Sequence, residues 1–321
     1  IEVKDEQDQP VLGATVRVYL PGPARREVYN ARTYANGQAL FFPLALADVP
    51  LAQIDRFVVA VEKDNWRDEF TLTRFEAQAA FSERWTVTLD TRRPVDSLNL
   101  DVLFLIDATG SMADEIAKIQ DTIFDVAAQI DALPGRPNVR YGMVTYRDRG
   151  DEFVTRTYEF TPDVGDFHAN LSTVRADGGG DTPESLNEAL HQALHGVEWG
   201  GGDTVQLVFL VADAPPHLDY PQDYDYAAEM AVAASRGIKI FPIASSGLDD
   251  QGEYIYRQIA QFTQGRFIFL TYEGPTNGGA PGEATTHHVE DYSVANLDDL
   301  LVKLVEEELA YQTPQLAQGQ Y

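Results

Sequence analysis

Oxygen-bearing side chains follow directly after two long apolar segments in the second half of the chain. The first segment ends in Asp107, and Thr109 and Ser111 come two and four residues later. The second segment, residues 204–212, ends in Asp213. Carboxylates and hydroxyls are the hard oxygen ligands that suit Mg²⁺, Mn²⁺ and Ca²⁺. If the two segments are neighbouring strands, these four side chains predict a divalent-cation site.

Two further loops offer oxygen ligands of the same kind. Asp148 follows a third apolar segment, and a glycine-rich stretch leads into Asp181, Thr182 and Glu184. None of these loops has a lysine, and none has the Gly-x-Gly-x-x-Gly fingerprint that a dinucleotide site needs. The loops therefore favour a cation over a phosphate group.

Two enzyme classes are also disfavoured by the residues present. An aspartyl phosphotransferase would need a second aspartate where Thr109 stands. A hydrolase would need a Ser–His–Asp arrangement with supporting loops, and none is evident. His217 follows Asp213 closely, but we expect it to be an exposed loop residue.

The periodicity of the second half places these loops at the ends of strands. Apolar segments alternate with segments of helical period, which is typical of a mostly parallel sheet covered by helices on both faces. Strands are expected at residues 98–106, 139–146, 153–160, 204–212, 238–244 and 266–270, and helices at 111–133, 183–197, 221–236, 251–264 and 296–310. In such a doubly wound α/β domain, ligands bind at the carboxyl ends of the strands.

The first 93 residues have a different pattern. Strands with the period of two are expected at residues 14–19, 56–61 and 84–89. Asn36-Gly37 is a strong hairpin signal, and only residues 74–80 suggest a helix. This pattern predicts an all-β sandwich of antiparallel strands.

Almost all of the net charge lies in the second half. Of the 321 residues, 51 are acidic and 24 basic, a formal net charge of −27. Before Pro94 there are 14 acidic and 12 basic residues, which leaves a net charge of −25 for the rest. Such a field repels nucleic acid and attracts cations. There is no cysteine and no apolar run of about 18 residues, so neither a disulfide nor a membrane span is expected.

The sequence Asp-x-Thr-x-Ser at the end of an apolar strand resembles the metal-ion-dependent adhesion site of von Willebrand factor A domains. The resemblance extends over about residues 98–312, because several separated loops match in the right order. It implies that Thr109 and Ser111 bind Mg²⁺, or else Mn²⁺ or Ca²⁺, directly through their hydroxyls. It also implies that Asp107 and Asp213 hold metal-bound water molecules.

The loops look most similar to those of the von Willebrand A-like domains in integrin β chains. There an Asp-x-Pro-Glu loop supplies a direct carboxylate ligand, which corresponds to Glu184 in this chain. The integrin α-type pattern would instead place a threonine ligand at Thr182. Glu184 is the favoured assignment, and Thr182 is the alternative.

The same resemblance implies two secondary metal sites beside the central one. Asp114 and Glu115 correspond to acids of a regulatory site, although acids are also common in the first turn of a helix. The residues that resemble the other, synergistic site are Asp148, Asp181, the carbonyl of Pro183, and Glu184. The chain departs from the integrin pattern at Gly179, where an asparagine ligand is usual, and it lacks the long integrin insertion.

Residues 10–16 and 34–39 resemble the transthyretin-like, carboxypeptidase-regulatory-type sandwich of bacterial surface proteins. The expected organisation is a sandwich at residues 1–93, a von Willebrand factor A domain at 94–312 and a polar tail at 313–321. The sandwich is expected to be a spacer without catalytic or metal chemistry.

These features together predict a binding module rather than an enzyme. A cation held by neutral hydroxyls and water-bridged carboxylates keeps positive charge and one open coordination position. The Asp or Glu carboxylate of a protein partner can fill that position, which indicates metal-dependent adhesion, outside the cell or at its surface. The alternative is an accessory subunit or a metal-dependent hydrolase domain of a larger enzyme assembly. The chain is expected to be a monomer or part of a larger multidomain chain, without nucleic acid.

Overall fold

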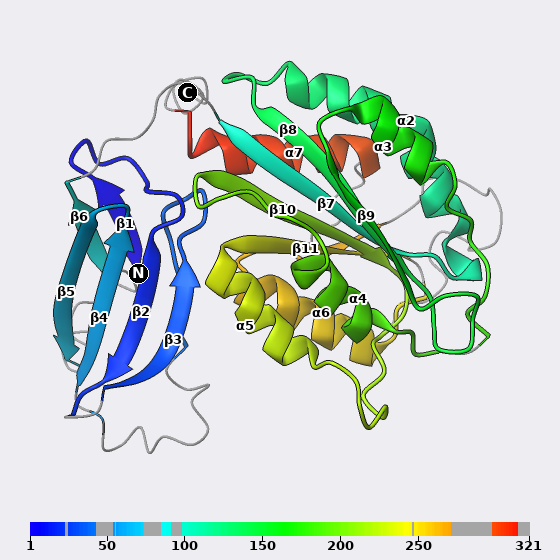
Figure 1. Cartoon of the computed structure of the whole chain (residues 1–321). Helices are drawn as coiled ribbons and strands as arrows, with labels where there is room; N and C mark the ends of the chain where they lie inside the picture. The colour runs from blue at the N-terminus through cyan, green and yellow to red at the C-terminus, as the bar shows by residue number, and fades with distance from the viewer. Residues whose placement is uncertain are drawn as a thin grey trace.

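The computed structural model has a small β part and a larger α/β part (Figure 1). The structure describes residues 1–22, 25–42, 54, 56–73, 85–90, 98–180, 182–245, 247–270 and 297–313. The helix expected at 74–80, the boundary between residues 93 and 94, and most of the 313–321 tail lie outside these ranges. The division into three segments therefore stays a prediction.

A six-stranded sheet forms the centre of the larger part. In the order β12-β11-β10-β7-β8-β9, its strands are Ile268–Phe269, Ile238–Ala244, Thr204–Ala212, Asn99–Asp107, Asn138–Tyr146 and Thr155–Thr161. Neighbouring strands are parallel except for β8 and the edge strand β9, which are antiparallel. Strands β10 and β11 are buried along their whole length, as a parallel sheet between two helical layers requires.

Helices cover both faces of this sheet (Figure 1). On one face lie α2 (Ala113–Asp131), α3 (Val164–Leu171) and α7 (Leu297–Ala310), and on the other lie α4 (Leu186–His195), α5 (Tyr226–Arg236) and α6 (Asp250–Phe262). The first layer packs on strand side chains such as Phe104, and the second packs on side chains such as Leu105. Alternate residues of β7 thus serve two cores, which confirms the doubly wound α/β architecture.

Several local features differ from the expected elements; the helix expected from residue 221, for example, begins only at Tyr226. A short 3-10 turn, η3 (Gly110–Met112), precedes α2 in place of a continuous helix. The helix expected from residue 183 begins only at Leu186, because the backbone of Glu184 is hydrogen-bonded to the loop after β10. Helix α3 was not expected, although Asp163 caps it by accepting from two backbone N–H groups.

The first strands form two small sheets. A four-stranded antiparallel sheet has the order β3-β2-β4-β5, with strands Arg26–Arg32, Thr15–Leu20, Arg56–Lys63 and Trp66–Thr73. The second sheet pairs β1 (Glu2–Asp5) with β6 (Thr86–Leu89), in parallel rather than in the expected antiparallel sense. Both sheets bury apolar side chains in one core, which includes Val3, Val59 and Leu89. We call this sandwich-like part the β unit; its relation to transthyretin-like domains stays a prediction.

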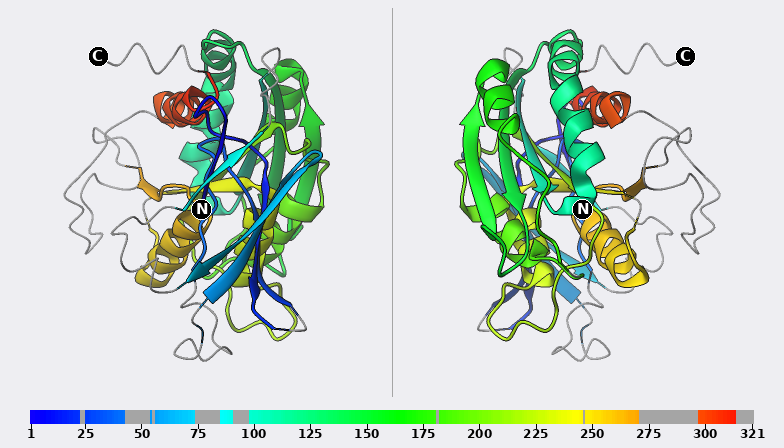
Figure 2. Two further views of the ribbon diagram at one scale, coloured as in Figure 1. Left: turned by 90° about the vertical axis from the view of Figure 1, so that its left-hand side faces the viewer. Right: turned by 90° about the vertical axis from the view of Figure 1, so that its right-hand side faces the viewer.

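The β unit packs against the edge of the central sheet where the parallel strands begin. Gly13 lies so close to Gly202, just before β10, that a Cβ on Gly13 would be 1.7 Å from the Gly202 carbonyl oxygen. Lys63 forms an ion pair with Asp203 at 2.5 Å, and α5 contacts β3. Seen from that side, the strands of the β unit stand in front of the larger sheet (Figure 2). The strands β7 and β10 therefore end on the side away from the β unit.

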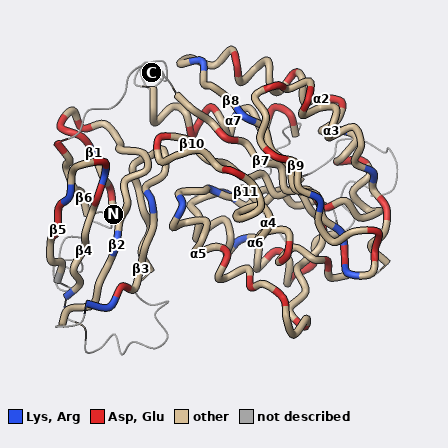
Figure 3. Tube along the Cα trace, in the orientation of Figure 1, with Lys and Arg blue, Asp and Glu red and all other residues tan. Residues whose placement is uncertain are grey.

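The acidic residues are spread along the helices and loops of the α/β part rather than gathered on one element (Figure 3). The net charge therefore does not by itself mark a binding face. Among the described residues, no helix is both long and apolar enough to span a membrane.

Candidate metal centre

Asp107 is the last residue of strand β7 and lies in the interior at the carboxyl edge of the sheet. Asp107 is fully buried, and Tyr146 of β8 is its register partner. Its Oδ1 accepts hydrogen bonds from the Thr109 backbone N–H at 2.9 Å and from the Thr109 hydroxyl at 2.7 Å. These bonds fold the Asp-x-Thr segment back on itself, so that both side chains lie at one point.

The loop after β10 meets the loop after β7 at this edge. Ser111 lies in the turn η3, and its hydroxyl oxygen is 3.4 Å from that of Thr109. Burial raises the pKa of Asp213, and a hydrogen bond with the Ser111 side chain partly offsets this effect. The two loops, far apart in the sequence, therefore share one site.

Glu184 reaches the same place from a third loop. Its backbone N–H donates to the Pro215 carbonyl at 3.0 Å, its own carbonyl accepts from the His217 N–H at 3.1 Å, and the residue is 2 % exposed. Gly179 has a φ of +67°, and a Cβ there would lie 2.6 Å from Thr109 Cβ and 2.8 Å from Glu184 Oε1. Only a glycine fits between Thr109 and Glu184, which is a steric reason for the departure from the integrin pattern.

Burial and mutual repulsion raise the pKa values of these acids. Burial raises the pKa of Asp107 to about 7, and the charge of Asp213 adds to this effect. Burial raises the pKa of Glu184 to about 9, and the charge of Asp107 is the next contribution. Both carboxylates are thus removed from water and placed near other acids. A divalent cation would offset both effects.

The donor set fits a hard divalent ion. Among the described residues, Asp107 Oδ2, Glu184 Oε2 and the hydroxyl of Tyr146 are buried without a partner in hydrogen-bond geometry, although the Tyr146 hydroxyl lies close enough to Asp107 to lower its pKa. Leaving a buried acceptor unsatisfied costs about 1–3 kcal/mol. Together with the hydroxyls of Thr109 and Ser111, these oxygens suit Mg²⁺, Mn²⁺ or Ca²⁺. That they bind a metal, and which of them bind it directly or through water, stays a prediction.

The remaining predicted ligands lie around this cluster. Asp114 is exposed in the first turn of α2, whereas Glu115 is 5 % exposed and its charge helps to raise the pKa of Asp213. Thr182, the alternative to Glu184, is exposed. Asp181 lies outside the described residues. The secondary sites therefore stay predictions.

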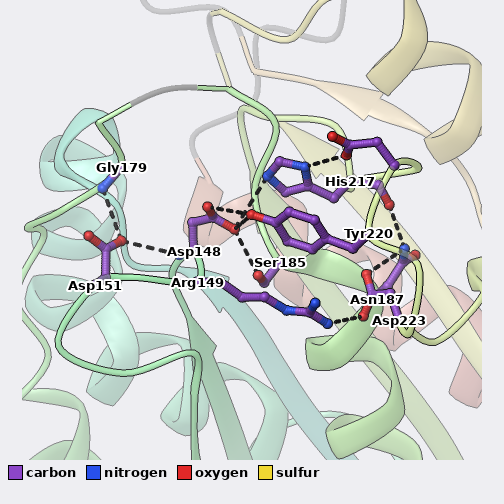
Figure 4. Close-up of polar contacts among 10 residues, drawn as sticks. Asp148, Arg149, Asp151, Gly179, Ser185, Asn187, His217, Tyr220 and Asp223 are labelled. Atoms are coloured by element: carbon purple, nitrogen blue, oxygen red, sulfur yellow. Dashed lines mark hydrogen bonds and ion pairs between the residues drawn. The ribbon is translucent and has the colours of Figure 1, made fainter.

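Asp148, which we expected at a secondary site, belongs to a hydrogen-bond network beside the cluster (Figure 4). Its Oδ1 accepts from the Ser185 hydroxyl at 2.8 Å, and its Oδ2 accepts from the Tyr220 hydroxyl at 3.0 Å. His217 Nε2 is 3.4 Å from Oδ1, and Arg149 lies over the Tyr220 ring at 4.3 Å. A metal at Asp148 would compete with hydrogen bonds from two other loops.

Asp151 is an acid of this region that the sequence did not single out. Its Oδ2 accepts from the Gly179 N–H at 3.1 Å and from the Asp148 N–H at 3.2 Å (Figure 4). It therefore ties the loop after β8 to the glycine that separates Thr109 from Glu184. The signal in the sequence is weak, because Asp-x-x-Asp in a loop is common on protein surfaces.

The expectation that His217 is exposed was wrong. His217 is 6 % exposed, its Nδ1 is 2.7 Å from Asp219 Oδ1, and its ring stacks on Tyr220 with centroids 3.8 Å apart. The Asn187 side chain donates to the His217 carbonyl at 2.7 Å. Tyr220 folds back over the His217 ring and covers it, a contact that residue types and spacing do not reveal.

Residues 101–272 match a family model described as the von Willebrand factor A domain. The matched segment is just over half of the chain. It contains all five residues of the cluster: Asp107, Thr109, Ser111, Glu184 and Asp213.

Two relatives are similar to part of this chain. The ariadne-like RING finger protein R811 of Acanthamoeba polyphaga mimivirus is 25 % identical over 187 residues, which is 53 % of this chain and 18 % of that protein. The alpha-protein kinase vwkA of Dictyostelium discoideum is 26 % identical over 153 residues, 47 % of this chain and 24 % of that protein. This chain thus matches about a fifth of the length of each relative.

Among solved structures, proximal thread matrix protein 1 from the mussel byssus is similar over 68 % of this chain and 47 % of that chain. The TM-score is 0.43, and the sequence identity is 17 %.

Proposed function

This chain belongs to the von Willebrand factor A domain family, and from that premise we propose that it binds a protein partner through a divalent cation. Domains of this family generally serve as protein-interaction modules rather than as enzymes. The cation is Mg²⁺, Mn²⁺ or Ca²⁺, held among Asp107, Thr109, Ser111, Glu184 and Asp213. The group that it captures is an Asp or Glu carboxylate of the partner.

The residues of the cluster would have different roles in binding the ion. When bound, the cation supplies positive charge that an acidic group of the partner can satisfy. Thr109 and Ser111 would contribute neutral oxygens, which leave more of that charge available than carboxylates would. Asp107 already fixes Thr109 by two hydrogen bonds, one from its backbone N–H and one from its hydroxyl. Glu184 adds one negative charge from a backbone segment pinned at both its N–H and its carbonyl.

One observation carries the proposal: Asp107 Oδ2 and Glu184 Oε2 are, among the described residues, buried without a donor in hydrogen-bond geometry. Desolvated acids that repel one another are unfavourable in a protein core. They become favourable where a cation shares them. A purely structural cluster would instead have donors around these oxygens, as Asp148 has.

Calorimetric titration of the EDTA-treated protein with Mg²⁺, Mn²⁺ and Ca²⁺ tests the cation site. Thr109→Val keeps the shape of the side chain and removes the hydroxyl, so we expect metal affinity to fall by at least about tenfold. The matched control is Thr122→Val, whose hydroxyl only donates to the Lys118 carbonyl within α2. Equal affinities of wild type and Thr109→Val would refute the site.

The captured group is tested with short peptides that differ only at one acidic position. We expect binding of a selected Asp- or Glu-containing peptide in Mg²⁺, and loss of binding in EDTA. The same peptide with Asn or Gln at that position should not bind. Peptide binding that persists in EDTA would contradict capture of the carboxylate through the cation. It would not decide whether the metal site exists, which the calorimetric titration tests separately.

The names of the two relatives favour a second candidate function. One is named a kinase and the other a RING finger protein, and this chain matches only a small part of each. In this candidate the chain is the recognition part of a larger enzyme assembly, wherever in the cell or at its surface that assembly works. A hydrolase role is less favoured, because the acids of the cluster would hold the metal and leave no general base. Metal-dependent turnover of a model ester or peptide by the isolated chain would favour the hydrolase role over the recognition role.

A further inference from the structure

We propose a second metal site, for a transition ion of the zinc class, at His191, His195 and Glu229. The two histidines lie one turn apart on α4, so their side chains project from the same face of the helix. Glu229 lies in the first turn of α5, which contacts α4. The three side chains meet between these helices. Helices α4 and α5 lie on the face of the sheet shown at the bottom of Figure 1.

The distances bring three ligand atoms to one point. His191 Nδ1 is 3.0 Å from Glu229 Oε1, and His195 Nε2 is 3.3 Å from Glu229 Oε2. All three potential ligand atoms lie within 4.8 Å of one another. Ligands at the usual 2.0–2.2 Å from a tetrahedral zinc ion are about 3.4 Å apart. Small side-chain rotations are therefore enough to place the three atoms around an ion.

The ring contacts hold the imidazoles in position. The His191 ring stacks on Tyr224 with centroids 3.6 Å apart and planes 6° apart. The His195 ring stacks on His191 at 4.4 Å. The two side chains therefore lose less conformational entropy when an ion binds, which favours binding.

An independent observation at Glu229 also points to a ligand. Glu229 is 6 % exposed, and among the described residues its Oε2 is buried without a hydrogen-bond partner. The adjacent His195 Nε2 lies close enough for an ion pair but not in hydrogen-bond geometry. A buried carboxylate in this state is costly unless a cation compensates it.

The chemistry separates this site from the one around Asp107. Two imidazoles and one carboxylate form a ligand set of catalytic zinc sites, in which a fourth position stays open. Imidazole suits Zn²⁺, Cu²⁺ and Ni²⁺, whereas Mg²⁺ and Ca²⁺ prefer oxygen ligands only. The His195 side chain is 41 % exposed, so an ion can enter from solvent and keep a water molecule in the open position.

Zinc titration of the untagged full chain in excess Mg²⁺ tests the proposal, because Mg²⁺ occupies the oxygen-ligand site. We expect one Zn²⁺ per chain, and an affinity at least about tenfold lower in His195→Ala and in Glu229→Gln. His195→Ala changes a partly exposed side chain, so its fold is expected to persist. The matched control is His168→Ala on α3, whose ring contacts Phe124 and Ser172 and, among the described residues, no acid.

Co²⁺ substitution gives a second measurement that does not depend on affinity. Imidazole and carboxylate ligands in tetrahedral geometry give visible absorption, which should appear in wild type and in Asp107→Ala but not in His195→Ala. Zinc affinity that is unchanged in His195→Ala would overturn the proposal. Zinc binding that disappears in Asp107→Ala but persists in His195→Ala would also overturn it, because the ion would then belong to the first site.

Discussion

Buried acids lie in two places at the carboxyl edge of the sheet: Asp107 and Glu184 in the cluster, and Asp148 beside it. They differ in the hydrogen-bond donors that surround them. Asp107, Glu184 and Asp148 are 0 %, 2 % and 7 % exposed, so burial does not distinguish them. Asp148 accepts hydrogen bonds from the hydroxyls of Ser185 and Tyr220. Among the described residues, Asp107 Oδ2 and Glu184 Oε2 have no donor in hydrogen-bond geometry. A lack of donors, rather than burial, therefore distinguishes the acids of the proposed cation site from Asp148.

The largest expected effect concerns the pH dependence of the metal-free protein. A carboxyl whose pKa is raised by folding stabilises the fold while it is protonated. That stability is complete below the unfolded pKa of about 4 and is lost as the pH rises through the folded pKa. The folded pKa is about 7 for Asp107 and about 9 for Glu184. We therefore expect the free energy of unfolding in EDTA to fall between pH 5.5 and pH 9, by about 1.4 kcal/mol for each unit of raised pKa that is traversed.

Urea unfolding at several pH values measures this fall, and one pair of variants isolates its cause. Glu184→Gln removes one of the two carboxyls and should flatten the curve. Glu188→Gln, in the first turn of α4, should follow the wild type. Saturating Mg²⁺ should also flatten the wild-type curve. A wild-type curve in EDTA that rises over this range would mean that the acids are not desolvated together.

The next effect is the stabilisation that the metal gives. At a hundredfold excess over its dissociation constant, a bound ion stabilises the native state by about 2.7 kcal/mol. We expect Asp107→Ala to lose this gain, and to be neutral or slightly stabilising without metal because one repelling charge is gone. The measurement is the melting temperature with and without Mg²⁺. The control is Asp121→Ala, which changes an exposed acid on α2 and should keep the full Mg²⁺-induced shift in melting temperature. Equal shifts in Asp107→Ala and wild type would mean that Asp107 does not contribute to the cation site.

The smallest effect concerns the network around Asp148. Tyr220→Phe removes one hydroxyl that donates to Asp148, so we expect a loss of about 1 kcal/mol in the free energy of unfolding. Magnesium affinity should not change. The control is Tyr254→Phe, whose hydroxyl is on an exposed side chain of α6. A marked change in Mg²⁺ affinity in Tyr220→Phe would show that Asp148 belongs to the same metal site as Asp107 and Glu184.

The sequence predicted those parts of the molecule whose signal is local. Strands β7, β10 and β11 are long apolar segments, and Asp107 and Asp213 mark where two of them end. Parallel pairing then brings the two aspartates together without further information.

The rest depends on contacts that spacing does not encode. Helix α3 has eight residues and buries only Phe167 and Leu171, too few to establish a helical period. The burial of His217 depends on the stacked ring of Tyr220. The cluster at His191 and Glu229 was missed because its acid lies on another helix.

The position of the β unit has a mechanical consequence. Gly13 and Gly202 meet before β10 begins, and Asp213 follows its last residue at the other end. A chain anchored through the β unit and holding a partner at the cation would therefore carry tension along β7 and β10. The hydrogen bonds of a sheet run across the strands, so such a pull loads them in shear and shares the force among them. The same bonds would open one after another if the force peeled the strands apart, so the arrangement suits an attachment that must resist pulling.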